Sequence, residues 1–318
     1  MKPLTDNALD RLRRAAELPD LTGTRYRVVS KLGQGGMGAV YCVEDESLGR
    51  QVALKVIALS DIEGEFRNRL LHEARVIAQL EHPGIVPVHD VGTLPDGRVF
   101  YTMKLVQGQR LDQHRSTLTT LTERLRLFQR ICEPVAFAHA HAVLHRDLKP
   151  QNIMVGPFGE VLVMDWGLSK LVDDSQETNS ASTRPHVSTE TQHGAVLGTP
   201  GYMSPEQAKA NPSEVSYPTD VYSLGVILKF LVEGFDSLPR PLAAILKKCL
   251  EQEPSARYPF AHDLESDIGR YLDDRAVSAY PEGPFAKLWR WVLRNQAWLL
   301  LVAAYLVMRT LFILWKSR

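Results

Sequence analysis

The order of strand-like and helix-like segments predicts an α+β fold built as two lobes. A strand-rich part covers residues 26–105, and a mostly helical part covers residues 106–280. Segregated strands and helices are typical of α+β proteins, whereas alternating ones indicate a parallel sheet. The junction is expected near Val106–Gly108.

Composition excludes several classes of protein. Of 318 residues, 44% are hydrophobic and 23% are charged, which is typical of a globular chain and not of a disordered or collagen-like one. The 37 basic and 37 acidic residues cancel, so no nucleic-acid partner is expected. Cys42, Cys132 and Cys249 are far apart and lack metal-ligand spacing, which indicates free thiols in a reducing compartment.

The first lobe is expected to begin after a short leader. Residues 1–25 contain a helical pattern that stops at Pro19, and their lack of an apolar run indicates no signal peptide. Three strand-like runs follow within 26–57, separated by turn residues. Residues 63–80 then place Phe66, Leu70, Ala74, Ile77 and Leu80 on one helical face. Two further strands are expected around 86–91 and 99–105.

The second lobe is expected to be helical from Leu121. Two short strands, NIMVG and VLVMD, flank Gly156–Gly159. Residues 173–194 are polar and without periodicity, and a loop of that length is usually functional or disordered. Helical patterns resume after Pro205.

A glycine-rich segment, GQGGMGAV, lies between the first two predicted strands. Gly33, Gly35 and Gly38 would let backbone N–H groups approach a phosphate closely. Because the segment does not precede a helix, it disfavours dinucleotide binding. The alternative is a tight hairpin with no ligand.

Lys55 lies in the apolar strand VALK, where its charge needs a partner. The candidate partner is Glu73 on the following helix, and such an ion pair would direct Lys55 toward the α- and β-phosphates of a nucleotide. The alternative is a lysine that reaches the surface.

The segment HRDLKPQN, followed by DWG, combines carboxylate, amine and amide groups. Asp147, Lys149 and Asn152 are close in sequence, and Asp165 comes thirteen residues after Asn152. Hard oxygen ligands suit Mg²⁺, and a separate carboxylate can receive a hydroxyl proton. These motifs therefore predict Mg²⁺–nucleotide chemistry.

Together these motifs resemble the eukaryotic-type (Hanks-type) protein kinase family over residues 26–272, and their wording is most like bacterial serine/threonine kinases. The resemblance implies a bilobal kinase fold, ATP and Mg²⁺ as cofactors, and protein substrates. It implies Asp147 as catalytic base, Lys149 as the stabiliser of the transferred phosphoryl group, and Asn152 and Asp165 as metal ligands. The residues that it assigns to ATP binding are Gly33, Gly35, Gly38, Val40, Ala53, Lys55, Glu73, Met103, Lys104 and Val106.

The resemblance also implies structural and regulatory residues. Glu206 should pair with Arg257, and Asp220 should brace the catalytic loop. Thr199 should contact the catalytic Asp and Lys. Arg146 is typical of kinases that are switched on by phosphorylation of the activation loop. The candidate phosphorylation sites are Ser188, Thr189 and Thr191, and the alternative is a solvated loop without a switch.

Three positions depart from the family pattern. Lys104 replaces a common glutamate, and Trp166 replaces the phenylalanine of the D-F-G motif. Arg257 comes only 37 positions after Asp220, so the lobe is expected to be shortened after the sixth helix of the family (helix F). The shortening puts substrate docking in doubt, and a pseudokinase scaffold is the alternative function.

The C-terminal region is basic and apolar. Residues 283–318 contain six basic and no acidic side chains, which leaves residues 1–282 with a net charge of −6. Residues 281–296 are expected to be a basic juxtamembrane segment and residues 297–315 a transmembrane helix, although Arg309 opposes insertion. The alternatives are a helix lying on the membrane or covering the kinase.

These observations predict a single-pass protein of the cell membrane with a cytoplasmic kinase domain. With only residues 316–318 beyond the expected span, the sequence indicates a tail-anchored kinase without an external sensor, and a truncated reading frame would look the same. A homodimer is possible.

Overall fold

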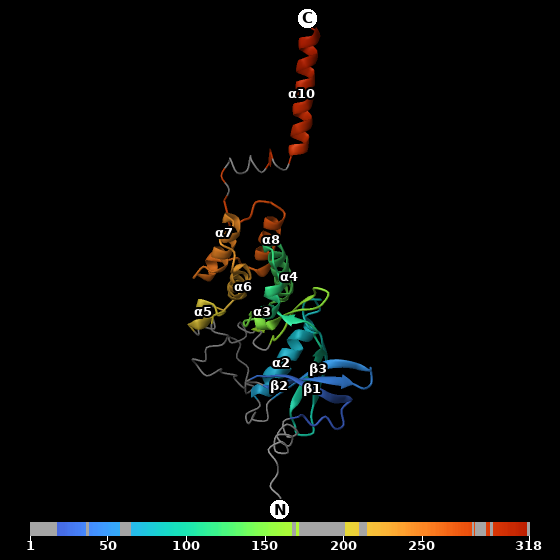
Figure 1. The fold of residues 1–318 in the computed structure, drawn as a ribbon. Coiled ribbons are helices and arrows are strands. Elements are labelled where there is room, and N and C mark those ends of the chain that lie inside the picture. Colours follow the sequence, from blue (N-terminus) through green and yellow to red (C-terminus); the bar gives the residue numbers. More distant parts are fainter. Residues whose placement is uncertain are drawn as a thin grey trace, which may run out of the picture.

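The computed structural model describes residues 18–35, 38–57, 65–166, 170–171, 201–209, 215–281, 283, 291–292 and 295–316. Two lobes lie one beyond the other, with a sheet in the first and packed helices in the second (Figure 1). The predicted α+β plan is therefore confirmed. Most of the expected leader lies outside the described residues.

The first lobe is an antiparallel sheet of five strands in the order β1-β2-β3-β5-β4. The strands are β1 (Tyr26–Gly35), β2 (Gly38–Asp45), β3 (Arg50–Ile57), β4 (Val88–Thr93) and β5 (Val99–Lys104). β-Branched and aromatic side chains suit such half-buried strands. Each strand lies close to a predicted run, because period-two patterns and turn residues mark strands locally.

One helix, α2 (Glu65–Gln79), packs on the sheet against β3, β4 and β5. Its expected apolar face is present, since Leu70, Ala74 and Ile77 are buried. Residues four apart share a helix face, so Glu73 lies beside this apolar stripe and reaches the sheet with it. The amphipathic pattern of α2 thus carries a carboxylate into the interior.

The second lobe is built around α4 (Leu121–Ala140), α6 (Tyr217–Val232) and α8 (Ala261–Leu272). Helix α4 contacts both of the others, and their apolar faces form the largest buried cluster. A capping box between Thr120 and Glu123 satisfies backbone groups at the start of α4. Shorter helices α3 (Leu111–His114), α5 (Pro205–Ala208) and α7 (Arg240–Cys249) complete the lobe (Figure 1).

The second lobe also contains several very short elements. Strands β6 (Gln109–Arg110), β8 (Ile153–Val155) and β9 (Val161–Val163) form one sheet, and β7 (Val143–Leu144) pairs with β10 (Lys170–Leu171). Single turns of 3₁₀ helix are η1 (Arg115–Thr117), η2 (Pro150–Asn152) and η5 (Pro254–Ala256).

The connection from α6 to α7 is short. Residues 233–239 alone join the two helices, and these described residues contain no helix. The carbonyls of Leu231 and Glu233 at the end of α6 accept hydrogen bonds from Arg124, and Arg115 donates to Glu233 as well. Two arginines therefore cap α6 where the chain turns back, which is favourable for orphan carbonyls at a helix C-terminus. This short connection lies where the sequence predicted a shortened lobe, and the shortening relative to the family stays a prediction.

The expected C-terminal helix is present as α10 (Gln296–Lys316). It lies beyond the helical lobe in Figure 1, and many of its apolar side chains are exposed. No helix in the described part of the chain combines the length and the apolar character needed to cross a membrane. The expected transmembrane span is therefore not found there.

Candidate active site

Lys55 and Glu73 form the ion pair that the sequence predicted. Lys55 Nζ lies 2.8 Å from Glu73 Oε1 and 2.9 Å from Oε2, and the Glu73 side chain is 2% exposed. Lys55 Nζ also donates to Asp165 Oδ1 at 3.0 Å. Burial alone would lower the pKa of Lys55, but Tyr101, Glu73 and Asp165 outweigh it and raise that pKa. The lysine is therefore a fixed cation and not a surface group.

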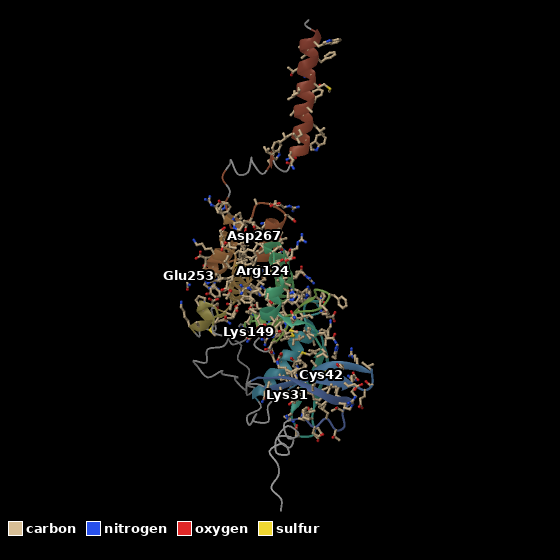
Figure 2. The ribbon with its side chains drawn as sticks, viewed as in Figure 1. Lys31, Cys42, Arg124, Lys149, Glu253 and Asp267 are labelled. Atoms are coloured by element: carbon tan, nitrogen blue, oxygen red, sulfur yellow. The ribbon has the colours of Figure 1, made fainter. Side chains whose placement is uncertain are left out.

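The segment between β7 and η2 brings three predicted residues together. Lys149 Nζ donates to Asp147 Oδ2 at 2.7 Å, and Asn152 Nδ2 donates to the Asp147 backbone oxygen at 2.9 Å. These side chains lie on the side of the helical lobe nearest the sheet, where Figure 2 labels Lys149. An amine, an amide and a carboxylate therefore meet at one edge between the lobes.

A buried carboxylate on α6 holds this segment in place. Asp220 is fully buried and accepts hydrogen bonds from the backbone N–H groups of His145 and Arg146 at 2.9 and 2.8 Å. His139 completes the set, with Nε2 3.0 Å from Asp220 Oδ2. Since His139 Nδ1 accepts from the Ala261 N–H, its Nε2 carries the proton and donates. Asp220 thus braces the loop, as the resemblance implied.

This bracing fixes an unusual backbone. Arg146 has φ 68° and Asp165 has φ 65°, both in the left-handed region. Such conformations cost about 1–3 kcal/mol and persist only where surrounding contacts impose them. Burial raises the pKa of the Asp220 carboxyl, but hydrogen bonds and the His139 and His145 rings outweigh it, so the pKa is lowered. Asp220 therefore stays an anion that can hold the strained loop.

Glu206 and Arg257 form the second predicted ion pair. Their atoms approach to 2.7 and 2.8 Å in a bidentate contact, and both side chains are at most 2% exposed. Arg257 also donates to the backbone oxygens of Glu251, Gln252 and Pro218. Every strong donor in this buried group is paired, which is the condition for a buried salt bridge to be tolerated.

The described glycines of the glycine-rich segment lie at the end of β1 and the start of β2. Gly33 pairs with Val40 and Gly35 pairs with Gly38 across the two strands. Nothing lies within 4 Å of a Cβ built at Gly33. The two strands that flank the segment are therefore paired as in a hairpin, with open space beside Gly33, and whether the segment binds a phosphate stays a prediction.

The residues expected to hold an adenine lie around the end of β5. Ala53 pairs with Met103 across the sheet, and Ala53 is 4% exposed. The Lys104 N–H donates to the Pro87 oxygen at 3.1 Å, so this backbone donor is already used within the protein. Val106 follows in the irregular segment that joins the lobes. Of the two Lys104 backbone groups expected to contact an adenine, only the carbonyl oxygen remains a candidate.

A sequence model of the protein kinase domain matches residues 26–239. The chain belongs to the protein kinase family. The match covers the sheet, the paired Lys55 and Glu73, the segment from β7 to η2, and α6.

Curated relatives agree with this assignment. A serine/threonine-protein kinase PknD of Protochlamydia amoebophila is 34% identical over 299 residues, covering 79% of this chain and 30% of the relative. The proteins of the same name from Chlamydia trachomatis serovar D and Chlamydia felis are 39% and 34% identical, covering 78% of this chain and 32% and 31% of the relatives. This kinase chain spans about a third of the length of the curated relatives it matches.

The donor set fits Mg²⁺ that is bound together with a nucleotide. The Asp165 side chain is 51% exposed and its Oδ1 accepts from Lys55. Asn152 lies close to it in the fold, because the N–H of Met164, the residue before Asp165, donates to the Asn152 backbone oxygen at 2.8 Å. Within the described ranges, no three His, Cys, Asp or Glu side chains gather as a metal cage. Protein sites for Mg²⁺ usually give one or two carboxylates and leave the remaining positions to water and phosphates. Asp165 and Asn152 are suited to that role.

The Trp166 departure is accommodated by packing. Its indole is 1% exposed, its Nε1 donates to the Val163 oxygen at 3.3 Å, and its ring lies 4.6 Å from the His145 ring. The His145 Nε2 contacts the Met164 oxygen at 3.0 Å. The Trp166 ring therefore contacts both His145, which directly follows β7, and Val163 at the end of β9.

Four predicted residues fall outside the described part of the chain, namely Thr199, Ser188, Thr189 and Thr191. One residue was missed from the sequence. Tyr101 lies opposite Lys55 in the β3–β5 pairing, and its hydroxyl donates to Glu73 Oε1 at 2.9 Å. Alternation along β5 placed Tyr101 on the same face as Met103, which was the available signal.

Proposed function

We propose that this chain is an active serine/threonine protein kinase, which transfers the γ-phosphate of ATP to Ser or Thr hydroxyls of proteins. The observation that carries the proposal is the meeting of Asp147, Lys149 and Asn152 in one braced loop. The Lys55–Glu73–Asp165 chain supplies a cation for the phosphates. Relatives named serine/threonine-protein kinase support the same substrate class.

In the proposed reaction the substrate hydroxyl oxygen forms a bond to the γ-phosphorus, and the bond from that phosphorus to the β–γ bridging oxygen breaks. Asp147 accepts the hydroxyl proton, and ADP leaves with the bridging oxygen. Lys149 neutralises charge on the transferred group, and Lys55 holds the α- and β-phosphates. Bound Mg²⁺ would neutralise phosphate charge, with Asp165 and Asn152 as its protein ligands.

The test compares the full-length chain with its Asp147→Asn variant after incubation with ATP and Mg²⁺. Intact mass should increase in steps of one phosphate for the unmodified chain, or phosphate should appear on an added protein substrate. The variant should lose transfer while keeping ATP affinity. Asp273→Asn is the matched control, because Asp273 is exposed and distant from the site. Equal transfer by the Asp147 variant would refute the proposal.

A nucleotide-binding scaffold without phosphotransfer is the second candidate. The short connection 233–239 favours it, since the family's usual docking helices would follow α6 there. The same experiment separates the two functions. A folded chain that binds ATP but transfers no phosphate, even to itself, is the result expected of a scaffold.

We also propose that phosphorylation of Ser188, Thr189 or Thr191 activates the kinase. Support comes from Arg146, whose Nε atom is buried and lacks a hydrogen-bond partner among the described residues. Burial lowers the pKa of this guanidinium and the Asp220 charge offsets that effect only in part, so a phosphate beside Arg146 would add a second anionic partner. Replacing all three candidate residues with Ala should lower activity, and activity equal to that of the parent chain would oppose the switch.

We propose for localisation that α10 attaches the chain to the cell membrane with the kinase domain in the cytoplasm. The single-pass anchor expected from the sequence and a helix lying on the membrane surface are two outcomes that the test separates, because α10 does not combine the length and the apolar character of a span. The exposed apolar side chains of α10 support attachment, among them Trp298, Leu300, Met308 and Trp315. Flotation of the full chain with phospholipid vesicles tests attachment, and resistance to alkaline carbonate separates a span from a surface helix. Recovery of the chain only in the dense, vesicle-free fraction would refute membrane attachment. Sedimentation velocity of the chain without vesicles tests whether it forms a homodimer.

A further inference from the structure

The Glu73 carboxylate is held by two neighbouring strands and not by Lys55 alone. Tyr101 Oη donates to Glu73 Oε1 at 2.9 Å, while Lys55 Nζ donates to both carboxylate oxygens. Tyr101 and Glu73 are each 2% exposed. Hydrogen bonds to a buried charged group are stronger than neutral ones, and an unsatisfied buried carboxylate is costly.

The sheet register explains why these donors converge. Lys55 on β3 and Tyr101 on β5 are directly paired, so both side chains leave the same face of the sheet. Helix α2 packs on that sheet and contributes Glu73. The Lys55 ammonium also lies 5.8 Å from the centre of the Tyr101 ring, so the ring shields the ion pair on one side.

The hydrogen bonds of Lys55 show what the Tyr101 hydroxyl adds. An ammonium has three N–H donors, and here Lys55 contacts Glu73 Oε1, Glu73 Oε2 and Asp165 Oδ1. A phosphate that binds Lys55 must displace one of these contacts. If the contact to Glu73 Oε1 is lost, the Tyr101 hydroxyl still satisfies that oxygen. Glu73 then keeps its place while Lys55 turns toward the phosphate.

We propose that Tyr101 is a positioning residue of the kinase site, whose hydroxyl fixes Glu73 and through it the Lys55 side chain. The inference rests on the proposed phosphotransfer and adds a residue to the same site. The effect belongs to the hydroxyl, since a phenylalanine would fill the same space without the hydrogen bond. Burial raises the pKa of Tyr101, so the hydroxyl keeps its proton and remains a donor.

The experiment compares Tyr101→Phe with Tyr26→Phe in the full-length chain. Tyr26 is the matched control because it is also a buried tyrosine of this sheet whose hydroxyl donates to a carboxylate, that of Asp90, at 3.0 Å. Tyr101→Phe should lower kcat/KM for ATP about tenfold, the size expected for one hydrogen bond to a charged group. Tyr26→Phe should change kcat/KM less than twofold under conditions where both variants are folded.

A second measurement does not depend on catalysis. Denaturant unfolding of nucleotide-free Tyr101→Phe, Glu73→Ala and the double variant forms a double-mutant cycle. The two substitutions should be non-additive by about fivefold or more in the unfolding equilibrium constant, as expected for groups in contact. Tyr26→Phe combined with Glu73→Ala should be additive.

The two arms separate the possible failures. Kinetics of Tyr101→Phe within twofold of the parent, or additive unfolding with Glu73→Ala, would overturn the positioning role. A parent chain without phosphotransfer would instead refute the proposed function. In that event the unfolding cycle alone decides whether Tyr101 holds Glu73.

Discussion

Arg257 and Glu206 form a buried bidentate ion pair that joins η5 to the first turn of α5. Thr219 on α6 donates to Glu206 Oε1 at 2.9 Å, and this oxygen also accepts from Arg257 Nη1. Helix α5 also contributes Gln207, which donates to the Arg146 backbone oxygen at 2.8 Å. The pair therefore fixes the segment that packs directly beneath the catalytic loop.

Replacing Arg257 with Ala should lower the free energy of unfolding by about 3–5 kcal/mol, because an uncompensated carboxylate would remain buried. Denaturant unfolding measures the change. Arg275→Ala is the control, since its pair with Asp273 is exposed on both sides and should contribute less than about 1 kcal/mol. Equal losses for the two variants would contradict the argument.

A second buried carboxylate holds the chain after α8. Asp267 is fully buried and accepts from Tyr258 Oη, from both the N–H and the hydroxyl of Ser278, and from the Ala279 N–H at 2.7–3.1 Å. It lies at the end of the helical lobe farthest from the sheet (Figure 2). Since Tyr258 directly follows Arg257 in the chain, the hydrogen bonds of Asp267 lie next to the Arg257–Glu206 ion pair.

Arg270 Nη1 donates to Asp267 Oδ1 as well, at 3.1 Å, so five donors surround this carboxylate. Replacing Asp267 with Asn should destabilise the chain by about 2–4 kcal/mol, because the amide turns one acceptor into a donor among these five donors. Asp263→Asn on the same helix is the control, and it should cost less. Hydrogen exchange of the Ser278 and Ala279 amides should accelerate in the Asp267 variant alone. Unchanged protection of these amides would show that Asp267 does not hold the segment.

Sequence reasoning succeeded where one segment carries its own signal. The strands near β1–β3, helix α2 and the Lys55–Glu73 pair follow from alternation, helical period and the need of a charged strand residue for a partner. Sequence reasoning failed where a contact depends on strand register or on a later segment that folds back onto an earlier helix. Tyr101 meets Glu73 through the β3–β5 pairing, and Asp267 gains its Ser278 and Ala279 donors through the return of the chain after α8.

Acid should destabilise the folded chain through its buried carboxylates. In Asp220, Glu206 and Asp267, burial raises the pKa, but hydrogen bonds to each carboxylate outweigh it, aided at Glu206 by the charge of Arg257, so each pKa is lowered. In the unfolded chain these carboxyls have pKa values of about 4. The three groups therefore stabilise the fold above that pH, and they lose this contribution as the pH falls through their lower pKa values in the folded state. Tm should be nearly level from about pH 7 to 5 and drop below about pH 4. Tm that rises on acidification would contradict this sign.

The three cysteines should react slowly with alkylating agents while the chain is folded. All three are free and buried, and burial raises the pKa of Cys42, Cys132 and Cys249. The thiolate is the nucleophile, so a raised pKa and low access both slow the reaction. Mass spectrometry after iodoacetamide should show labelling in denaturant but little without it, and rapid labelling of the folded chain would contradict the buried positions.

The close approach of α6 and α7 makes Gly225 sensitive to substitution. A Cβ at Gly225 would lie 2.5 Å from Cys249 Cβ and 3.1 Å from Leu250 Cδ2, so the two helices would have to move apart. Gly225→Ala should therefore cost about 1–3 kcal/mol, despite the helix preference for alanine. Gly269→Ala on α8 is the matched control, since its Cβ would meet only the flexible Gln129 side chain at 3.3 Å. Thermal unfolding that ranks Gly225→Ala as no less stable than Gly269→Ala would mean that α7 packs less tightly on α6.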